Sequence, residues 1–297
     1  MKEPLLRYKE IFLGNQCNNK CLYCLYRQKD FSQPDFNALT TDLKQGDEDG
    51  VALYGGEPTL RNDLVDIIHT AKQNGHRRIK LITNGRDFSN NQFLHRIVNA
   101  GCSLFEIKLW GSHPELHDHL TQAPDSFWQT IQGLENLQRL SFDKFICLRI
   151  PLCKQNYTDV INTITTGINF SVHRIILSFQ DHKLALRELI PHVHTAIQVS
   201  ILNRVWILSE GLPFCVMHGL EHHISEIYYG YESALNQRSY RQHKYCKHCI
   251  YREICPGVDA EYLKQFGHGE FTPVKGSKYM QDIKVLYGQK ESHSHLL

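Results

Sequence analysis

The chain has 297 residues, of which 41% are apolar, and its formal net charge is +2. This length and composition argue against a disordered or fibrous protein and predict one barrel-sized domain with a small additional module. No apolar run is long enough for a membrane helix, and acidic residues flank the short apolar pair of the N-terminal segment. We therefore expect a cytoplasmic protein with neither a signal peptide nor a membrane partner. The short, mixed basic runs argue against nucleic-acid binding.

Six short aliphatic or β-branched runs predict buried strands at residues 10–14, 51–54, 79–83, 104–110, 145–151 and 175–179. Helical patterns lie between several of them, for example at residues 62–74, 127–140 and 157–168. This alternation predicts an α/β fold with a parallel sheet and right-handed crossovers. Six such units are typical of a partial (β/α)6 barrel resembling a TIM barrel, with its chemistry at the carboxyl ends of the strands.

The pattern changes after a long predicted helix at about residues 183–204. We place a domain boundary near Val205, with the barrel at residues 1–205. Residues 206–297 are rich in cysteine and interrupted by Gly and Pro, which predicts a small irregular α+β domain with a C-terminal tail.

A cysteine loop follows the first predicted strand, where Cys17, Cys21 and Cys24 stand in a CxxxCxxC spacing. The reducing cytoplasm disfavours disulfides, so clustered cysteines indicate a metal site. Three thiolates converging on one 4Fe-4S cluster would leave its fourth iron open. A zinc knuckle is the alternative, but residues 25–37 contain no fourth Cys or His ligand.

Together with this loop, two later motifs resemble the radical S-adenosylmethionine (radical SAM) superfamily over about residues 9–179. Gly55-Gly56-Glu57-Pro58 follows the second strand, as the family's GGEP element does. The resemblance implies that it grips the amino group of the methionine moiety of SAM, with glycines that allow close backbone approach. Thr83-Asn84-Gly85 closes the third strand, which in the family lies near the ribose or methionine end of the cofactor.

The resemblance assigns two more residues to the cofactor, and a third candidate stands where the chain departs from the family pattern. Tyr23 occupies the aromatic position that lies against the adenine, and Arg149 resembles an arginine aimed at the cofactor carboxylate. On the fourth strand, relatives often carry Ile-Ser-Leu, whereas this chain reads Ile107-Lys108-Leu109. Lys108 would then neutralise the carboxylate in place of the serine contact.

A second cysteine cluster combines Cys246, Cys249 and Cys255 with the upstream Cys215. Its CxxC spacing, with a further cysteine after five residues, resembles the SPASM and Twitch extensions of radical SAM enzymes. Asp259 stands where the next SPASM cysteine would be. The resemblance therefore implies one auxiliary 4Fe-4S cluster with Cys215 as fourth ligand, acting as an electron conduit. A structural zinc site remains the alternative.

Three other cysteines, Cys102, Cys147 and Cys153, match neither cluster, and buried inert thiols are the default interpretation. Cys153 lies just past the fifth strand, where its thiol could donate a hydrogen atom to a substrate radical. The neighbouring pair His117-Asp118 resembles one in relatives, but Asp118 could equally start a helix, and we assign the pair no catalytic role.

These resemblances imply an enzyme that reductively cleaves SAM to a 5'-deoxyadenosyl radical and takes a hydrogen atom from a substrate. We expect SAM and two 4Fe-4S clusters as cofactors, and an external electron donor such as flavodoxin or ferredoxin as a partner. A ribosomally made peptide undergoing cross-linking, oxidation or epimerisation is the favoured substrate, with a small metabolite as the alternative. A non-enzymatic iron-sulfur or zinc protein is the third interpretation. Sixteen residues precede Cys17, so we expect no separate leader-binding domain there.

Overall fold

The computed structural model describes residues 8–24, 26, 33–44, 48–140, 145–229 and 240–286. The chain divides into two compact units, one of Met1–Ile150 with Asn162–Ile175 and one of Pro151–Ile161 with Ile176–Leu297. This division passes through the strand region, so the expected boundary near Val205 stays a prediction. Each unit is described separately below.

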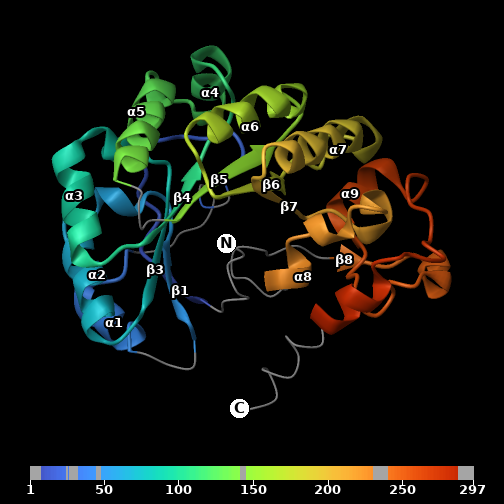
Figure 1. Cartoon of the computed structure of the whole chain (residues 1–297), viewed down its shortest axis with the longest axis horizontal. Helices are drawn as coiled ribbons and strands as arrows, with labels where there is room; N and C mark the ends of the chain where they lie inside the picture. Colours follow the sequence, from blue (N-terminus) through green and yellow to red (C-terminus); the bar gives the residue numbers. More distant parts are fainter. Residues whose placement is uncertain are drawn as a thin grey trace. The chain divides into compact units, whose positions relative to one another are not determined.

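Parallel strands in chain order form the framework of the first unit (Figure 1). They are β1 (Tyr8–Phe12), β2 (Gly50–Tyr54), β3 (Arg78–Thr83), β4 (Leu104–Lys108) and β5 (Phe145–Leu152). The sheet has seven strands in the order β1 to β7, which adds β6 (Arg174–Phe179) and β7 (Trp206–Glu210). The expected α/β partial barrel is confirmed.

The seventh strand was not expected. Strand β7 contains the short apolar run Trp206-Ile207-Leu208 and is soon followed by Gly211 and Pro213. On its own such a run does not distinguish a strand from a loop. Leu208 and Ile207 are completely buried, and this burial makes the segment a strand.

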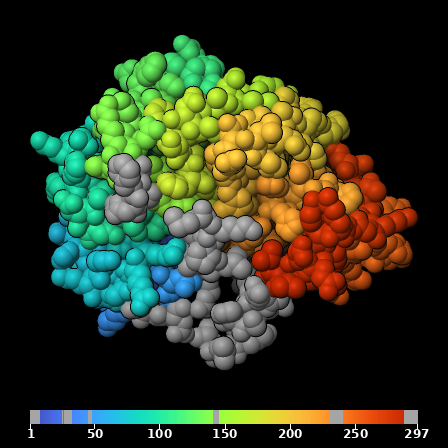
Figure 2. All heavy atoms as spheres, viewed as in Figure 1, coloured from blue at the N-terminus to red at the C-terminus, as the bar shows by residue number. Residues whose placement is uncertain are grey.

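Helices cover the outer face of the sheet in the first unit (Figure 1). Helix α2 (Leu64–Gln73) buries Leu64, Ile67, Ile68 and Ala71, the same apolar stripe that its sequence predicts. In the space-filling view, side chains of α3 and α5 form a continuous surface on this side (Figure 2). The helical elements of the unit are α1 (Phe36–Asp42), η1 (Pro58–Leu60), α2, η2 (Arg86–Ser89), α3 (Asn91–Ala100), α4 (Pro114–Thr121), α5 (Ser126–Arg139) and α6 (Val160–Asn169).

The second unit is less regular. Its helical elements are η3 (Tyr157–Asp159), α7 (Leu186–Leu202), η4 (Phe214–Met217), η5 (Glu221–His223), α8 (Glu226–Tyr229), η6 (Lys244–His248) and α9 (Ala260–Phe266). A two-stranded antiparallel sheet joins β8 (Tyr240–Arg241) to β9 (Val258–Asp259). Within the described part of the chain, no helix has the length and apolar character needed to cross a membrane.

Candidate active site

The cysteine loop is anchored through its backbone to the end of α4. Lys20 N–H donates to the carbonyl of Thr121 over 2.8 Å, and Leu22 N–H donates to that of Leu120 over 2.9 Å. These two bonds bracket Cys21 and hold the middle of the loop in place. The loop therefore does not depend on a bound metal for all of its order.

Backbone N–H groups also point at two of the cysteine sulfurs. Asn19 N–H donates to Cys17 Sγ and Tyr26 N–H donates to Cys24 Sγ, each over 3.4 Å. Hydrogen bonds to sulfur stabilise thiolates and help set the reduction potential of iron-sulfur clusters. The two bonds are thus the contacts that a cluster-binding loop is expected to make.

The three thiols lie close enough to influence one another. Burial raises the pKa of Cys17 to about 11, and the charges of Glu57 and Cys24 add to this effect. Burial raises the pKa of Cys21 to about 12, with further contributions from Cys17 and Cys24. Buried thiolates that repel one another need positive charge between them, and the iron of a 4Fe-4S cluster supplies it. The three residues therefore fit such a cluster.

The glycines of the Gly55-Gly56-Glu57-Pro58 motif bring this turn against the segment that leads into Cys17. A side chain at Gly56 would place its Cβ 2.4 Å from the carbonyl oxygens of both Asn15 and Gln16. Two hydrogen bonds use this close approach, from Gly56 N–H to Gly14 O and from Glu57 N–H to Gln16 O. In the structure, the close approach that glycine permits is to the protein's own backbone.

Glu57 joins the second motif to the third. Its Oε1 accepts hydrogen bonds from the hydroxyls of Thr83 and Thr59, over 2.6 and 2.7 Å, and its Oε2 accepts from Asn84 N–H over 2.7 Å. Burial raises the pKa of Glu57, and these hydrogen bonds oppose that shift. Because its carboxylate is surrounded by protein donors, Glu57 locks the ends of β2 and β3 together.

Asn84 and Arg86 extend this network to the cysteine loop. Asn84 Nδ2 donates to Asn18 Oδ1 over 2.7 Å. Arg86 Nη1 donates to Asn18 O over 2.6 Å and to Asn19 Oδ1 over 2.7 Å, while its Nε donates to Gln129 Oε1. The sequence interpretation missed Asn18 and Arg86, although Arg86 directly follows the Thr83-Asn84-Gly85 motif.

The three remaining cofactor candidates all have protein contacts. Tyr23 stacks on Trp110 with ring centroids 6.3 Å apart. Lys108 Nζ lies 5.7 Å from the centroid of the Tyr26 ring, a cation–π arrangement. Lys108 also lowers the pKa of Cys17 and Cys21, against the effect of burial. Its position on β4 thus brings a positive charge to the cysteine site.

Arg149 is engaged by a buried carboxylate. Arg149 Nε pairs with Glu106 Oε1 over 2.5 Å, and Lys80 Nζ pairs with Glu106 Oε2 over 2.8 Å. Burial opposes ionisation of Glu106, but the two cations outweigh it and hold the pKa of this carboxyl far below its usual range. The sequence interpretation missed Glu106 and Lys80. Both alternate with apolar residues along their strands, as charged residues on the solvent-exposed face of a strand also do.

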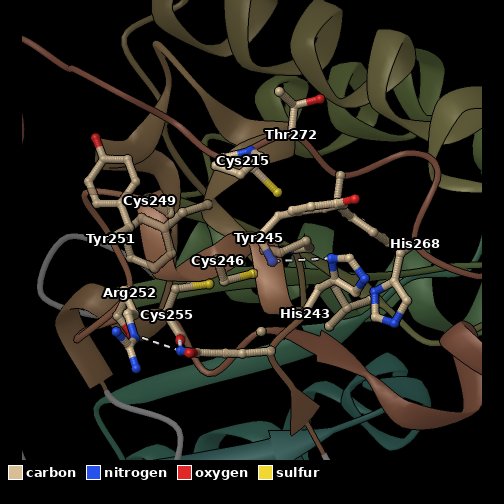
Figure 3. A pocket seen from close by; sticks show the side chains of 17 residues that line it. Cys215, His243, Tyr245, Cys246, Cys249, Tyr251, Arg252, Cys255, His268 and Thr272 are labelled. Atoms are coloured by element: carbon tan, nitrogen blue, oxygen red, sulfur yellow. Dashed lines mark hydrogen bonds between the residues drawn. The ribbon is translucent and has the colours of Figure 1, made fainter.

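The second cysteine cluster lines one cavity in the second unit (Figure 3). Cys215, Cys246, Cys249 and Cys255 line this cavity, which is partly open to solvent. Burial raises the pKa of Cys215 to about 12, with further contributions from the other three thiols. Within the described residues, no three Cys, His, Asp or Glu side chains are grouped tightly enough for a single metal ion. The four thiols line one cavity, and whether they hold a cluster or a zinc ion stays a prediction.

Gly257 and Asp259 each stabilise the local backbone next to this second site. Gly257, with φ of +104°, would place a Cβ 2.2 Å from Arg241 O, so only glycine allows β8 and β9 to meet there. Asp259 stands in place of a further SPASM cysteine and caps α9 by accepting from Glu261 N–H and Tyr262 N–H. This position serves the fold in the structure.

A family model described as the radical SAM superfamily matches residues 11–166, more than half of the chain. The chain belongs to the radical SAM superfamily. This membership implies SAM and a 4Fe-4S cluster as cofactors. The placement of that cluster at the Cys17, Cys21 and Cys24 loop stays a prediction.

Curated relatives include a GTP 3',8-cyclase of Limosilactobacillus fermentum, 27% identical over 196 residues that cover 63% of this chain and 58% of the relative. A probable GTP 3',8-cyclase of Saccharolobus islandicus is 28% identical over 172 residues, covering 56% of this chain and 54% of the relative. The chain thus spans about half the length of such relatives.

Among solved structures, Streptococcus suis SuiB bound to its precursor peptide SuiA has a TM-score of 0.56 at 16% identity, covering 69% of this chain and 49% of SuiB. The protein anSMEcpe with bound AdoMet and a Cp18Cys peptide has a TM-score of 0.56 at 14% identity. That match covers 96% of this chain and 97% of anSMEcpe. At these identities the likeness shows the shared radical SAM fold.

In this radical SAM chain, Cys153 is completely buried in the second unit. Its backbone N–H donates to Asn156 Oδ1 over 2.8 Å, and burial raises the pKa of its thiol to about 11. Cys102 and Cys147 are buried as well. The role of Cys153 as a hydrogen donor stays a prediction.

The pair His117-Asp118 makes hydrogen bonds to neighbouring segments of the protein. His117 Nδ1 accepts from Trp110 N–H over 3.2 Å, and burial lowers the pKa of His117 to about 4. Asp118 Oδ1 accepts from Ser126 Oγ and Phe127 N–H, so it caps the start of α5, the helix after its own. Both contacts are structural.

Proposed function

We propose that this radical SAM enzyme abstracts a hydrogen atom from a ribosomally made peptide during its maturation. A reduced cluster held by Cys17, Cys21 and Cys24 would give one electron to SAM, whose C5'–S bond would break to release methionine and a 5'-deoxyadenosyl radical. That radical would take a hydrogen atom from the peptide, becoming 5'-deoxyadenosine and leaving a peptide radical. The observation that carries the proposal is the hydrogen-bonded assembly of Glu57, Asn84 and Asn18, which ties the ends of two adjacent strands to the cysteine loop.

The chain's own residues would orient the cofactor and exclude water. In our proposal the backbone of Gly55 to Pro58 receives the amino group of SAM, because the Glu57 carboxylate is already surrounded by protein donors. Thr83 and Asn84 hold that turn in place, Tyr23 faces the adenine, and Lys108 and Arg149 offer positive charge to the carboxylate.

Four cysteines around the second cavity would hold an auxiliary 4Fe-4S cluster with no open iron. Such a cluster exchanges electrons and does not bind substrate, so its proposed role is to accept or deliver the electron that completes the reaction. A flavodoxin or ferredoxin would reduce the first cluster. The cysteine sets of the two units support the proposal of two clusters.

The substrate class is supported by the fold match that spans nearly the whole chain, which is to a radical SAM protein with a bound peptide. SuiB, another structural neighbour, is bound to a precursor peptide. A small metabolite is the second candidate, because curated relatives at 27% to 28% identity are GTP 3',8-cyclases.

The test is anaerobic reconstitution with iron and sulfide, followed by reduction and measurement of 5'-deoxyadenosine with SAM present. We expect product from wild type, none from Cys17→Ala, and wild-type yield from Cys102→Ala, which removes a buried thiol outside both clusters. Stimulation by peptides encoded near the gene would support peptide maturation, whereas stimulation by GTP alone would overturn it. No product under any condition would reject the enzyme.

For Cys153 the readout is solvent deuterium in the peptide product, measured by mass spectrometry. Loss of deuterium incorporation in Cys153→Ala, with SAM cleavage retained, would assign the thiol as hydrogen donor. Equal incorporation in Cys153→Ala and wild type would remove that role.

A further inference from the structure

Two cations approach the cysteine loop by separate routes, and each acts through a residue whose backbone N–H donates to a cysteine sulfur. The first is Arg86 on η2. Its Nη1 donates to Asn18 O and Asn19 Oδ1, over 2.6 and 2.7 Å, and Asn19 N–H in turn donates to Cys17 Sγ over 3.4 Å. The Nε bond to Gln129 Oε1 over 2.6 Å fixes the guanidinium plane.

The second cation is Lys108 on β4. Its Nζ lies 5.7 Å from the centroid of the Tyr26 ring, and Tyr26 N–H donates to Cys24 Sγ over 3.4 Å. Arg86 and Lys108 therefore act on opposite ends of the same loop.

The other charged groups around the loop do not cancel the positive charge of Arg86 and Lys108. Glu57 acts on Cys17 with the opposite sign, but its carboxylate is fully enclosed by hydrogen-bond donors. Arg149 faces Tyr26 and shares the carboxylate of Glu106 with Lys80, so the charge of Arg149 is partly balanced by a direct ion pair. Among the described residues, no carboxylate lies within salt-bridge distance of Arg86 or Lys108.

We propose that Arg86 is a positioning residue for the cysteine loop and that Arg86 and Lys108 together raise the reduction potential of its cluster. Reduction adds one negative charge to the cluster, and a nearby cation stabilises the reduced form more than the oxidised one. This inference rests on the cluster that family membership implies and does not depend on the identity of the substrate.

The experiment is an anaerobic redox titration of the reconstituted full chain, followed by electron paramagnetic resonance and performed without SAM. The absence of SAM removes any contribution from a contact between Lys108 and the cofactor carboxylate. The variants are Lys108→Met and Arg86→Gln, with Lys72→Met and Arg139→Gln as exposed controls of the same charge change. Iron content per chain is measured for every protein.

We expect Lys108→Met to hold as much iron as wild type and its cluster to be harder to reduce. At a fixed potential the ratio of reduced to oxidised cluster should fall about tenfold, which corresponds to about 59 mV for a one-electron couple. The controls should match wild type. Potentials of Lys108→Met and Arg86→Gln equal to those of the controls would overturn the proposal.

Arg86→Gln also loses part of its donor geometry, so incomplete iron loading is expected there. Arg86→Lys keeps the charge and separates the two effects. Restored loading with a wild-type potential supports the proposal, and a loaded Arg86→Gln protein with an unchanged potential contradicts it. If neither Arg86 variant loads iron, the Lys108 comparison decides alone, because Lys108 donates no hydrogen bond to the loop backbone in the described contacts.

Discussion

The hydroxyl of Thr83 donates to Glu57 Oε1 over 2.6 Å and so joins the two strand-end motifs of the cofactor site. Glu57 is buried, and its carboxylate depends on a few protein donors to remain ionised. This one contact links the turn after β2, which we propose binds SAM, with the end of β3. Further hydrogen bonds, from Asn84 to Glu57 and from Asn84 to Asn18, connect Glu57 to the cysteine loop.

Replacement of Thr83 by valine should therefore destabilise the fold and weaken SAM binding. The change keeps the shape but removes one donor to a buried carboxylate, with an expected cost of about 1–3 kcal/mol in the free energy of unfolding. Urea unfolding and SAM equilibrium dialysis measure the two effects. Thr195→Val, at an exposed helical position, should change stability by less than about 0.5 kcal/mol. Equal stability of the two variants would contradict the assigned role of Thr83.

Glu106→Gln should strongly destabilise the protein at neutral pH. It leaves Arg149 and Lys80 beside a buried neutral group, and breaking a buried ion pair in this way costs about 3–5 kcal/mol. The matched control is Glu135→Gln, which breaks an exposed pair with Arg139 and should cost less than about 1 kcal/mol.

The same pair predicts a pH dependence. Because the folded pKa of Glu106 is depressed, its stabilisation is fully present above the ordinary carboxyl pKa, about 4.3, and is lost as pH falls through the folded pKa. The stability difference between wild type and Glu106→Gln should stay constant from neutral pH to about 5.5 and shrink in more acidic solution. Urea midpoints across this range measure it. A difference that grows with acid would show that the sign is wrong.

His117 should remain neutral when exposed histidines are already charged. Its folded pKa of about 4 lies below the ordinary value of 6.5, so protonation of the unfolded chain makes the protein less stable as pH falls between these two values. His117→Gln should remove that part of the pH dependence, whereas His119→Gln, at an exposed position of the same helix, should keep it. Two-dimensional NMR of the imidazoles gives a direct measurement, and titration of His117 near 6.5 would refute the prediction.

Loss of one cysteine from the second set should remove one cluster. Cys255→Ala should lower iron by about four atoms per chain and leave SAM cleavage at the first cluster intact. Cys147→Ala, which removes a buried thiol from β5, should retain the full iron content. Zinc in stoichiometric amount, with iron unchanged in Cys255→Ala, would show a structural zinc site.

The sequence by itself predicted six of the seven strands of the parallel sheet and grouped the cysteines into two sets. Both depend on local pattern, since a buried strand reads as an apolar run and loop ligands recur at short spacings. The run at residues 51–54 became β2, and the stripe of α2 is buried as its periodicity predicts. The short run of β7 was missed because its identity as a strand depends on burial that only tertiary packing provides.

The tertiary structure decided which side chains meet at the strand ends. Arg86 reaches Asn18, 68 residues away, and Arg149 reaches Glu106, 43 residues away. Nothing near any of these residues in the chain marks its partner, because parallel crossovers bring together strand ends that are far apart in sequence. The charges around the cysteine loop and the donors around Glu57 therefore follow from the register of the folded sheet.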